Sequence, residues 1–315
     1  MDHKLSIIIP VYNEEKTVVQ LLDKVKESKL SISKELIIIN DGSTDNSGVL
    51  INEWYKKNPS QDGFDVQYIE KQNGGKGSAV REGIEHSTGS VLIIQDADLE
   101  YDPNDYQVCI DPILNGVARV VYGSRELKSN VKRVYSSPFF FLGGLLLSNW
   151  MNLLYGSNLT DEPTCYKCFD GELIRNIPFK GNKFEWEPEI TAKLLRLGMK
   201  IYEVPISYYP RRINEGKKIT WNDGLVALWI ALIWRFASIK DLKTKLSENN
   251  KLSSMFPHIQ KIKIALFIIV SLAFIVCMIV VAPAINSVEN KLTSQIHINY
   301  IQPVSSFLRF IYGRA

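Results

Sequence analysis

Two aspartates separated by a single residue carry the strongest chemical signal in the chain. Asp96 and Asp98 come directly after residues 91–94 (VLII), a short apolar run that predicts a buried strand. Alternate residues along an extended segment can direct both carboxylates towards one hard cation, and Mg²⁺ or Mn²⁺ prefers such oxygen ligands. A cation held there would bridge to a diphosphate. The alternative is a pair of solvated loop carboxylates, but their position at a strand end favours a metal site.

A second polar motif, residues 40–45 (NDGSTD), follows another apolar run at 36–39. Gly42 permits a tight turn, and Asp41 could accept hydrogen bonds from a base or a ribose. Helix capping is the competing interpretation, because Ser43 or Asp45 could cap the helix expected next in the chain. Both roles can hold at once.

Two more motifs lie at predicted element boundaries. Residues 10–14 (PVYNE) follow the run 5–9, so Tyr12 could pack against a nucleobase while Glu14 accepts hydrogen bonds from it. A helix start explains Asn13 and Glu14 equally well. Residues 73–77 (NGGKG) predict a flexible turn that presents one lysine to phosphate. This turn is not a P-loop, because a glycine follows its lysine where that motif needs Ser or Thr.

The elements that must position these motifs alternate between strand and helix. The expected strands are residues 5–9, 36–39, 66–69, 91–94 and 119–122, and the expected helices are residues 14–29, 43–57, 77–86 and 104–114. Such alternation is typical of right-handed crossovers and a mostly parallel sheet. Ligands of these sheets bind beyond the carboxyl ends of strands. The shared position of the four motifs therefore predicts one site.

Composition limits the class of protein. The chain has 315 residues, of which 45% are hydrophobic and 23% charged, so it can bury a full core and is not disordered. Four cysteines are too few for a disulfide scaffold. Cys165 and Cys168 form a lone Cys-x-x-Cys without suitably spaced companions, so we expect two packed thiols in a loop rather than a zinc site.

Charge is unevenly distributed along the chain. Residues 1–210 hold 23 Lys and Arg against 29 Asp and Glu, whereas residues 211–263 hold 11 against 4, a net charge of +7. This basic block precedes residues 264–284, which are 21 residues without a charge and predict a transmembrane helix. The positive-inside rule places the preceding domain in the cytoplasm and residues 285–315 on the far side. A buried core helix is the alternative.

Two other apolar stretches predict membrane contact. Residues 138–155 combine apolar side chains with paired glycines and polar residues, which favours a helix on the membrane surface over a second spanning helix. Residues 225–236 are too short to span, and Trp229 and Trp234 are typical of an interfacial helix. An ordinary core helix is the alternative for this second stretch.

With these motifs, the chain resembles the family-2 inverting glycosyltransferases of the GT-A fold over about residues 4–240. It is most similar to the branch acting on dolichyl and polyprenyl phosphates, as residues 123–125 (GSR), 160–164 (TDEPT) and 211–219 (RRINEGKKI) indicate. The resemblance implies an α/β fold with a Rossmann-like, mostly parallel sheet, followed by interfacial amphipathic helices and one C-terminal transmembrane helix. The expected parts are a cytoplasmic GT-A domain, a basic juxtamembrane segment with an interfacial helix, the transmembrane helix and an extracytoplasmic tail, at residues 1–210, 211–263, 264–284 and 285–315.

The resemblance also implies roles for individual residues. Catalysis is expected from Asp96, Asp98 and Arg125. The nucleotide sugar is expected to contact Pro10, Tyr12, Glu14, Asp41, Lys76 and Asp96. Mg²⁺ or Mn²⁺ would be held by Asp96, Asp98 and Glu100. The acceptor phosphate would be held by Arg125, Arg211, Arg212, Lys217 and Lys218, arginine being suited to bidentate contacts. Attraction to an anionic membrane surface is the alternative for the cluster at 211–218.

Three positions depart from the family pattern. Asn40 stands where the first acid of the Asp-Asp-Gly-Ser motif is usual, which is tolerable for a side chain that only forms hydrogen bonds. Glu100 stands where relatives often carry Gln, and a carboxylate could bind a metal more strongly. Lys167 follows Cys165-Tyr166 where Gly-aromatic-Arg is common, and Lys does not replace Arg as a phosphate clamp.

The implied reaction is the metal-dependent, inverting transfer of a hexose from GDP-mannose or UDP-glucose to the phosphate of a membrane polyprenyl or dolichyl phosphate. The product would be a β-linked lipid-phosphate sugar. The alternatives are a family-2 transferase that acts on another glycan, a processive polysaccharide synthase, and an inactive membrane scaffold that binds nucleotide sugars. No nucleic-acid partner is expected, and a homo-oligomer stays open.

Overall fold

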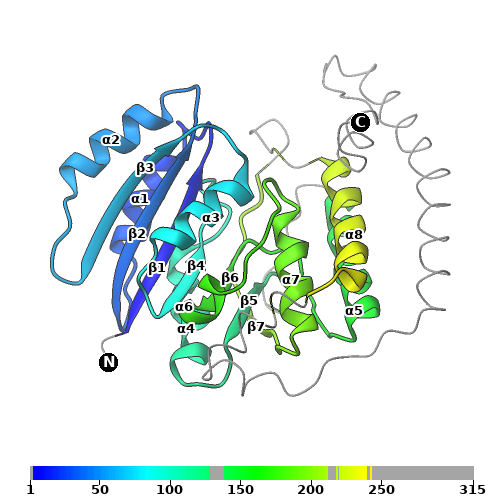
Figure 1. Cartoon of the computed structure of the whole chain (residues 1–315). Helices are drawn as coiled ribbons and strands as arrows, with labels where there is room; N and C mark the ends of the chain where they lie inside the picture. Colours follow the sequence, from blue (N-terminus) through cyan, green and yellow to red (C-terminus); the bar gives the residue numbers. More distant parts are fainter. Residues whose placement is uncertain (1–2, 128–137, 212–217, 219, 240–241, 243–315) are drawn as a thin grey trace, which may run out of the picture. The chain divides into compact units, whose positions relative to one another are not determined.

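The computed structural model describes residues 3–127, 138–211, 218, 220–239 and 242 (Figure 1). The chain divides into two compact units, Met1–Gln260 and Lys261–Ala315, and every described residue belongs to the first. The predicted transmembrane helix at 264–284 and the tail at 285–315 lie outside the described residues, and the predicted domain boundaries stay predictions.

A seven-stranded sheet forms the centre of this unit, in the order β3-β2-β1-β4-β6-β5-β7. Strand β6 runs antiparallel to both of its neighbours, and the other four pairings are parallel. The mostly parallel sheet expected from the sequence is therefore confirmed. The strands are Lys4–Val11 (β1), Ser33–Asp41 (β2), Phe64–Lys71 (β3), Val91–Ile94 (β4), Val120–Ser124 (β5), Lys167–Asp170 (β6) and Tyr202–Pro205 (β7).

The five predicted strands are all present, and four are longer than predicted. Strands β1 and β2 are buried almost along their whole length, in register through pairs such as Ile8 with Ile37. Parallel strands covered on both faces read as continuous apolar runs, which is why the sequence located them. Polar residues at their ends, such as Ser33 and Asp41, still pair in the ladder but break the apolar pattern.

Helices flank the sheet (Figure 1). They are Val18–Glu27 (α1), Ser47–Lys57 (α2), Lys76–His86 (α3), Tyr106–Leu114 (α4), Pro138–Tyr155 (α5), Gly171–Arg175 (α6), Trp186–Arg196 (α7) and Trp221–Phe236 (α8), with a 3-10 turn at Pro103–Asp105. Helix α3 packs against β1 so closely that a Cβ at Gly83 would lie 2.4 Å from the Ile8 side chain.

Two predicted helices begin four residues later than expected, because the residues before them form loop contacts instead. The Asn13 side chain accepts a hydrogen bond from Thr44 N at 2.8 Å, and Ser43 Oγ accepts one from Asn13 N at 3.0 Å. Asp45 Oδ1 accepts from Ser47 N at 2.9 Å, but the N-cap position of α2 is Asn46, which forms no side-chain capping bond, so an N-cap at Ser43 or Asp45 was wrong. The loops after β1 and β2 are thus joined before their helices start.

The strand order reverses at β1, which has β2 on one side and β4 on the other. The chain runs outward from β1 through β2 to β3 and then returns to β4 across β1. In open α/β sheets a reversal of this kind leaves a crevice at the carboxyl ends of the two central strands, where ligands bind. The motifs at 10–14 and at 96–98 follow these two strands.

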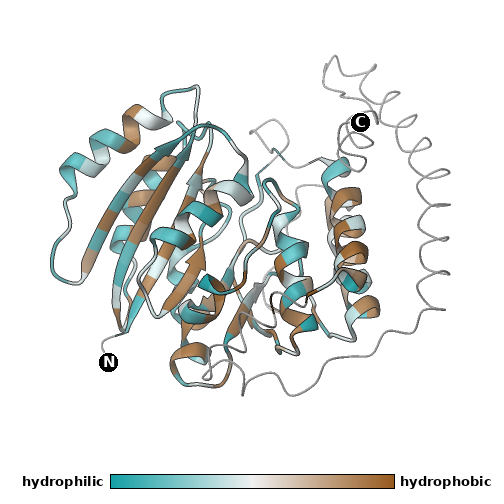
Figure 2. Cartoon of the chain, in the orientation of Figure 1, coloured by the Kyte–Doolittle hydropathy of each residue, from teal (hydrophilic) through white to brown (hydrophobic). Residues whose placement is uncertain are grey.

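Helices α5 and α8 lie side by side (Figure 1). Trp150 Nε1 donates to Leu228 O at 3.0 Å, and Tyr155 Oη donates to Ala231 O at 2.6 Å. Both helices are largely apolar (Figure 2), and α5 leaves four leucines exposed, namely Leu142, Leu145, Leu146 and Leu153. Within the described part of the chain, no helix has both the length and the apolar character needed to cross a bilayer.

Candidate active site

The loop after β4 carries Asp96 and Asp98, and the buried side-chain amide of Gln95 holds this loop in position. Gln95 Oε1 accepts hydrogen bonds from Tyr106 Oη and Tyr166 Oη, both at 2.6 Å, and Gln95 Nε2 donates to Asp96 O at 2.9 Å. Leu99 takes a φ of 62°, a left-handed conformation that is unusual for leucine. Strain of this kind persists where surrounding contacts hold it and is common at functional sites.

Asp96 faces a partly buried cation. Lys76 Nζ lies 2.9 Å from Asp96 Oδ1 and 2.9 Å from Glu187 Oε1, so one ammonium joins two carboxylates. Burial lowers the pKa of Lys76, but the charges of Asp96 and Glu187 outweigh it and hold that pKa well above its usual value. Lys76 therefore stays charged. The predicted turn does present its lysine to the site, where the ammonium meets carboxylates.

Asp98 faces a second cation. Arg211 Nη2 lies 3.1 Å from Asp98 Oδ2 and Arg211 Nη1 lies 2.9 Å from Glu14 Oε2. Burial, together with the charges of Asp96 and Glu100, raises the pKa of Asp98 to about 7 despite this arginine. Burial and the neighbouring carboxylates thus outweigh the attraction of Arg211, and a carboxylate perturbed in this way is typical of functional sites.

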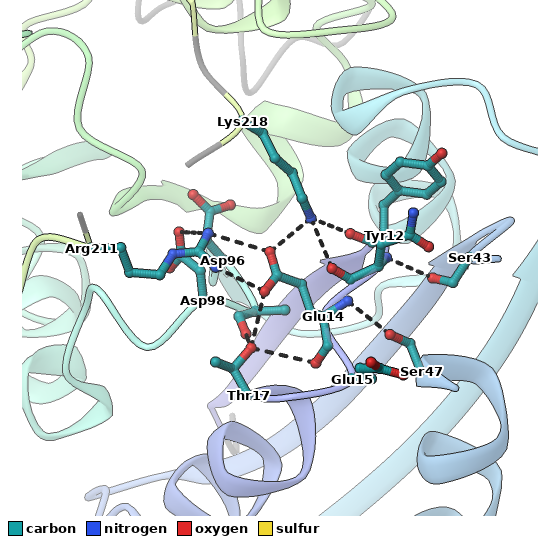
Figure 3. A network of polar contacts seen from close by, with 12 residues as sticks. Tyr12, Glu14, Glu15, Thr17, Ser43, Ser47, Asp96, Asp98, Arg211 and Lys218 are labelled. Atoms are coloured by element: carbon teal, nitrogen blue, oxygen red, sulfur yellow. Dashed lines mark hydrogen bonds and ion pairs between the residues drawn. The ribbon is translucent and has the colours of Figure 1, made fainter. Parts of the chain in front are cut away.

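Glu14 joins the loop after β1 to the same cluster (Figure 3). Lys218 Nζ donates to Glu14 Oε1 at 2.8 Å and also to the carbonyl of Tyr12, and its ammonium lies 5.6 Å from the centre of the Tyr12 ring. Thr17 Oγ1 lies 3.0 Å from Glu14 Oε2 and 2.8 Å from Ala97 O, and its one proton bonds to either oxygen. The structure thus brings together the motifs at 10–14 and 96–98 with Arg211 and Lys218. Pro10 lies within β1.

Asp41 organises the glycine-rich turn. Its carboxylate accepts hydrogen bonds from Gly74 N at 2.9 Å and Gly75 N at 2.7 Å, and Lys71 Nζ lies 2.9 Å from Asp41 Oδ1. These contacts join the loops after β2 and β3. The departure at Asn40 is compatible with hydrogen bonding, since its side chain accepts from Ser43 N at 3.1 Å and donates to Tyr68 Oη at 3.3 Å.

The glycines of the turn are required by a loop that crosses over them. A Cβ at Gly75 would lie 2.6 Å from Asn182 O, and one at Gly77 would lie 2.3 Å from Gly181 O. Ser78 N donates to Asn182 O at 3.0 Å. Close backbone approach therefore explains these glycines and places the segment before α7 beside Lys76.

The donor set of the loop after β4 fits a divalent cation. Asp96 and Asp98 offer hard carboxylate oxygens, and Mg²⁺ is commonly bound by one or two carboxylates together with substrate phosphates. Glu100 is held elsewhere, because its carboxylate accepts from Tyr208 Oη at 2.7 Å and from Arg211 N at 2.8 Å. Among the described residues no group of three acidic, His or Cys side chains is arranged to hold a metal. The residues that could hold one here are the two aspartates.

Arg125 lies on the side of the crevice formed by β5. Its Nε and Nη2 atoms donate to Asp161 at 2.7 and 2.6 Å, and its guanidinium lies 4.9 Å from the centre of the Tyr208 ring. Its Nη1 atom has no hydrogen-bond partner among the residues that the structure describes. The remaining predicted phosphate ligands, Arg212 and Lys217, lie outside the described residues.

Lys167 has an internal role. Its side chain is fully buried, and its ammonium donates to Glu162 O at 2.6 Å and Thr164 O at 2.8 Å. It therefore fixes the loop before β6. Cys165 and Cys168 are buried free thiols, but Cys168 lies in β6, so the prediction that both lie in a loop was half wrong.

Three contributors to the site were missed at the level of sequence. Glu187 reaches Lys76 from α7, Gln95 supports Asp96 from beneath, and Asp161 holds Arg125. Gln95 directly precedes the Asp-x-Asp motif, which could have drawn attention to it. Glu187 gave no such signal, because it lies far along the chain in an element that the sequence did not predict.

Comparison with known proteins places this crevice in a family. The model of "Glycosyl transferase family 2" matches residues 6–177, more than half of the chain. The chain belongs to this family. The prediction of a family-2 glycosyltransferase is thereby confirmed, and the matched region contains the four motifs at 10–14, 40–45, 73–77 and 96–98.

Curated relatives match a similar region. The chain is 28% identical to a dolichyl-phosphate beta-glucosyltransferase of Trichomonas vaginalis over 218 residues, covering 65% of each chain. It is 25% identical to the dolichol-phosphate mannosyltransferase of Pyrococcus furiosus, covering 68% of this chain and 59% of that one. A dodecaprenyl-phosphate galacturonate synthase of Rhizobium johnstonii is 24% identical, with 68% and 61% covered. The chain thus spans less than two thirds of the length of these relatives.

Solved structures share the fold. Glucosyl-3-phosphoglycerate synthase from Mycobacterium tuberculosis, in complex with uridine diphosphate, superposes with a TM-score of 0.55 at 18% identity, covering 74% of this chain and 79% of that one. This similarity confirms the expected GT-A type of α/β sheet.

Proposed function

We propose that the protein transfers a hexose from a nucleoside-diphosphate sugar, GDP-mannose or UDP-glucose, to the phosphate of a membrane polyprenyl or dolichyl phosphate. The observation that carries the proposal is the charge pattern of the crevice, where Asp96, Asp98 and Glu14 meet Lys76, Arg211 and Lys218. The relatives support the lipid acceptor, because those named above act on dolichyl, dolichol or dodecaprenyl phosphates by their names.

The donor would lie along the crevice with its nucleoside over the loops after β1 and β2. The exposed ring of Tyr12 offers a surface for a base, and Glu14 offers a hydrogen-bond acceptor beside it. A divalent cation held by Asp96 and Asp98, Mg²⁺ or Mn²⁺, would neutralise the leaving diphosphate as a Lewis acid. Lys76 lies beside Asp96, where its ammonium would add positive charge close to the leaving diphosphate.

The acceptor phosphate needs positioning more than activation. Its second pKa is about 6, so it is already ionised near neutral pH and needs no strong general base. Arg125 keeps one Nη free of described partners, and Arg211 lies beside Asp98. Their charges would offset repulsion between the two anionic substrates. In-line attack on the anomeric carbon would invert an α-linked donor to a β-linked product.

The apolar helices would keep this site at the membrane, with the catalytic domain in the cytoplasm. The exposed leucines of α5, which packs on α8, present a surface that suits the acyl region of a lipid leaflet. A lipid acceptor stays in the bilayer, so its phosphate can reach the crevice only from that plane. The basic residues at 211–263 would add attraction to anionic lipids.

Sugar transfer into lipid tests the reaction. Purified full-length protein with Mg²⁺ or Mn²⁺ is incubated with polyprenyl phosphate and, in turn, radiolabelled GDP-mannose, UDP-glucose and UDP-GlcNAc. We expect organic-phase label from one hexose donor, lost in Asp98→Ala. Retained donor binding without label in the lipid from any donor would contradict the proposed acceptor.

Substitution on α5 tests the membrane surface separately. In the full chain, Leu142→Ser with Leu146→Ser should lower turnover of long-chain polyprenyl phosphate in vesicles and leave turnover of a short, water-soluble prenyl phosphate unchanged. Val49→Ser is the matched control, because Val49 on α2 is as exposed as Leu142 (61% each). Equal turnover by all variants in vesicles would contradict the membrane role of α5.

A further inference from the structure

Glu187 occupies a place in the crevice that the proposed reaction has not used. It lies in the first turn of α7 and shares the ammonium of Lys76 with Asp96, at 2.9 Å from each carboxylate. The Glu187 carboxylate is thus separated from Asp96 by one bridging nitrogen. If the diphosphate of a donor lies at Asp96, one of the two groups attached to that diphosphate must lie within a few ångströms of Glu187.

The order of the strands indicates whether the group near Glu187 is the nucleoside or the sugar. Tyr12 and Glu14 follow β1, on one side of β4, and are the candidates for the nucleoside. Helix α7 lies on the other side, where Thr191 Oγ1 and Tyr122 Oη of β5 are 2.8 Å apart. A donor with its nucleoside over β1 and β2 and its diphosphate at Asp96 therefore has its sugar directed towards α7.

The chemistry of Glu187 suits a hydroxyl. Only Oε1 is bonded to Lys76, and Oε2 has no hydrogen-bond partner among the described residues. The side chain keeps 11% of its surface exposed, so it is open to a ligand. A carboxylate repels phosphate and accepts hydrogen bonds from hydroxyl groups. Beside it, the Lys76 ammonium donates, and an adjacent acceptor and donor match neighbouring hydroxyls of a hexose.

The main chain at Glu187 is held by the next turn of α7. Thr191 Oγ1 lies 2.9 Å from Glu187 O and 2.9 Å from Glu162 Oε1, and Glu162 is fully buried. A side chain that discriminates between sugars must be held in place by its supporting contacts. Thr191 holds the main chain at Glu187, and the ion pair with Lys76 holds its carboxylate.

We propose that Glu187, paired with Lys76, is a specificity-determining residue that accepts a hydrogen bond from a ring hydroxyl of the donor hexose. This inference rests on the proposed use of a nucleoside-diphosphate sugar, but not on the identity of the acceptor. Glu187 selects the sugar, while Tyr12 and Asp96 bind the rest of the donor.

Binding measurements separate sugar recognition from a structural role. Glu187→Gln keeps the shape and a hydrogen-bond acceptor for Lys76 but removes the charge. By calorimetry with Mn²⁺, we expect its affinity for UDP-glucose or GDP-mannose, whichever the wild type prefers, to fall about 10-fold, as for loss of a charge-assisted hydrogen bond. Its affinity for UDP or GDP should stay within about 2-fold. Glu185→Gln is the matched control, since Glu185 lies just before α7 and bonds Asn182 N instead of Lys76.

Deoxy donors test the contact directly. A panel of donors lacking one hydroxyl at a time is bound to wild type and Glu187→Gln. One member should bind both proteins equally, because the hydroxyl that Glu187 contacts is missing. The inference would be overturned if Glu187→Gln lost affinity equally for the sugar donor and the free nucleotide. It would also be overturned if no deoxy donor bound wild type and Glu187→Gln with equal affinity. If one deoxy donor bound both proteins equally but no sugar were transferred to lipid, only the proposed acceptor would be overturned.

Discussion

Glu35 and Asp98 are both acidic side chains at the ends of strands in one sheet, and their surroundings differ in kind. Glu35, near the start of β2, receives hydrogen bonds from Ser6 Oγ, Thr88 N and Oγ1, and Gly89 N. Asp98, beyond the end of β4, receives one from Glu100 N and faces the tip of Arg211. Donors on short side chains and on the backbone fill the hydrogen-bonding positions of the Glu35 carboxylate. The charge of Asp98 is instead offset by the end of the long Arg211 side chain.

The pKa values follow these surroundings. Burial raises the pKa of Glu35, but hydrogen bonds from Ser6 and Thr88 outweigh it and hold the value below the usual range. At Asp98 burial and neighbouring carboxylates prevail, and the pKa rises to about 7. A saturated carboxylate stabilises the fold, while an incompletely offset one is available to a substrate or a cation. Glu35, near the start of β2, thus has a structural role, and Asp98, beyond the end of β4, has a functional one.

Removal of the site carboxylate should have the largest effect on activity. Asp98→Asn is expected to lower sugar transfer by about 100-fold or more, because a group that offsets charge on the leaving diphosphate is lost. Its thermal midpoint should stay equal or rise, since crowding with Asp96 and Glu100 is relieved. Transfer rate and thermal unfolding are measured on one preparation. A lower midpoint of several degrees would show that Asp98 is structural and break the comparison.

Removal of the saturated carboxylate should have the opposite profile. Glu35→Ala is expected to lower the free energy of unfolding by about 3 kcal/mol, because Ser6 Oγ, Thr88 N and Thr88 Oγ1 lose their acceptor. Urea unfolding in detergent gives this value. The affinity of the remaining folded protein for nucleotide should equal that of the wild type. Weakened nucleotide binding with unchanged stability would reverse the assignment of the two carboxylates.

The pH dependence of the Glu35 contribution has a defined sign. The pKa of Glu35 is lower in the folded protein than its ordinary value of 4.5, so its stabilisation is present above pH 4.5 and is lost as the pH falls through the folded value. The stability difference between wild type and Glu35→Gln should therefore shrink below pH 4.5. Unfolding at pH 7 and at pH 4 measures it. A difference that grows on acidification would contradict the assignment.

The cation beside Glu35 should matter least. Lys4 Nζ lies 3.3 Å from Glu35 Oε2 and 3.2 Å from Asp65 Oδ2, on a side chain that is partly exposed. Lys4→Met should change the free energy of unfolding by less than about 1 kcal/mol, as for a solvated ion pair. Equilibrium unfolding checks this. A loss as large as that of Glu35→Ala would show that the charge of Lys4, rather than the fixed donors, holds Glu35.

The first half of the sheet could be predicted from sequence because burial on both faces leaves a direct pattern. Strands β1, β2 and β4 are continuous apolar runs, and the motifs after them share one edge by the geometry of parallel sheets. Strands β6 and β7 have four residues each and are placed by contacts distant in sequence. Unlike the four-residue β4 (VLII), these two segments (KCFD and YEVP) form no continuous apolar run that would indicate a buried strand.

The same limit applies to the site. Asp96, Asp98, Tyr12 and Glu14 could be identified because each follows a predictable strand. Their partners could not, since Glu187 lies in an unpredicted helix and the pairing of Arg211 with Asp98 is a tertiary contact. Asp41 illustrates a further limit, because the sequence indicated a polar side chain for a ligand, while the structure shows its carboxylate bonded to the amides of Gly74 and Gly75.

The central claim is that the carboxylates beyond β4 bind a donor diphosphate through a divalent cation. The most direct test is calorimetric titration of wild type and Asp98→Asn with UDP and GDP, each with Mn²⁺ and with chelator. The account predicts nucleotide binding by wild type with Mn²⁺, strong weakening by chelator, and weak binding by Asp98→Asn in both conditions. Equal nucleotide affinity of both proteins, with or without Mn²⁺, would contradict it.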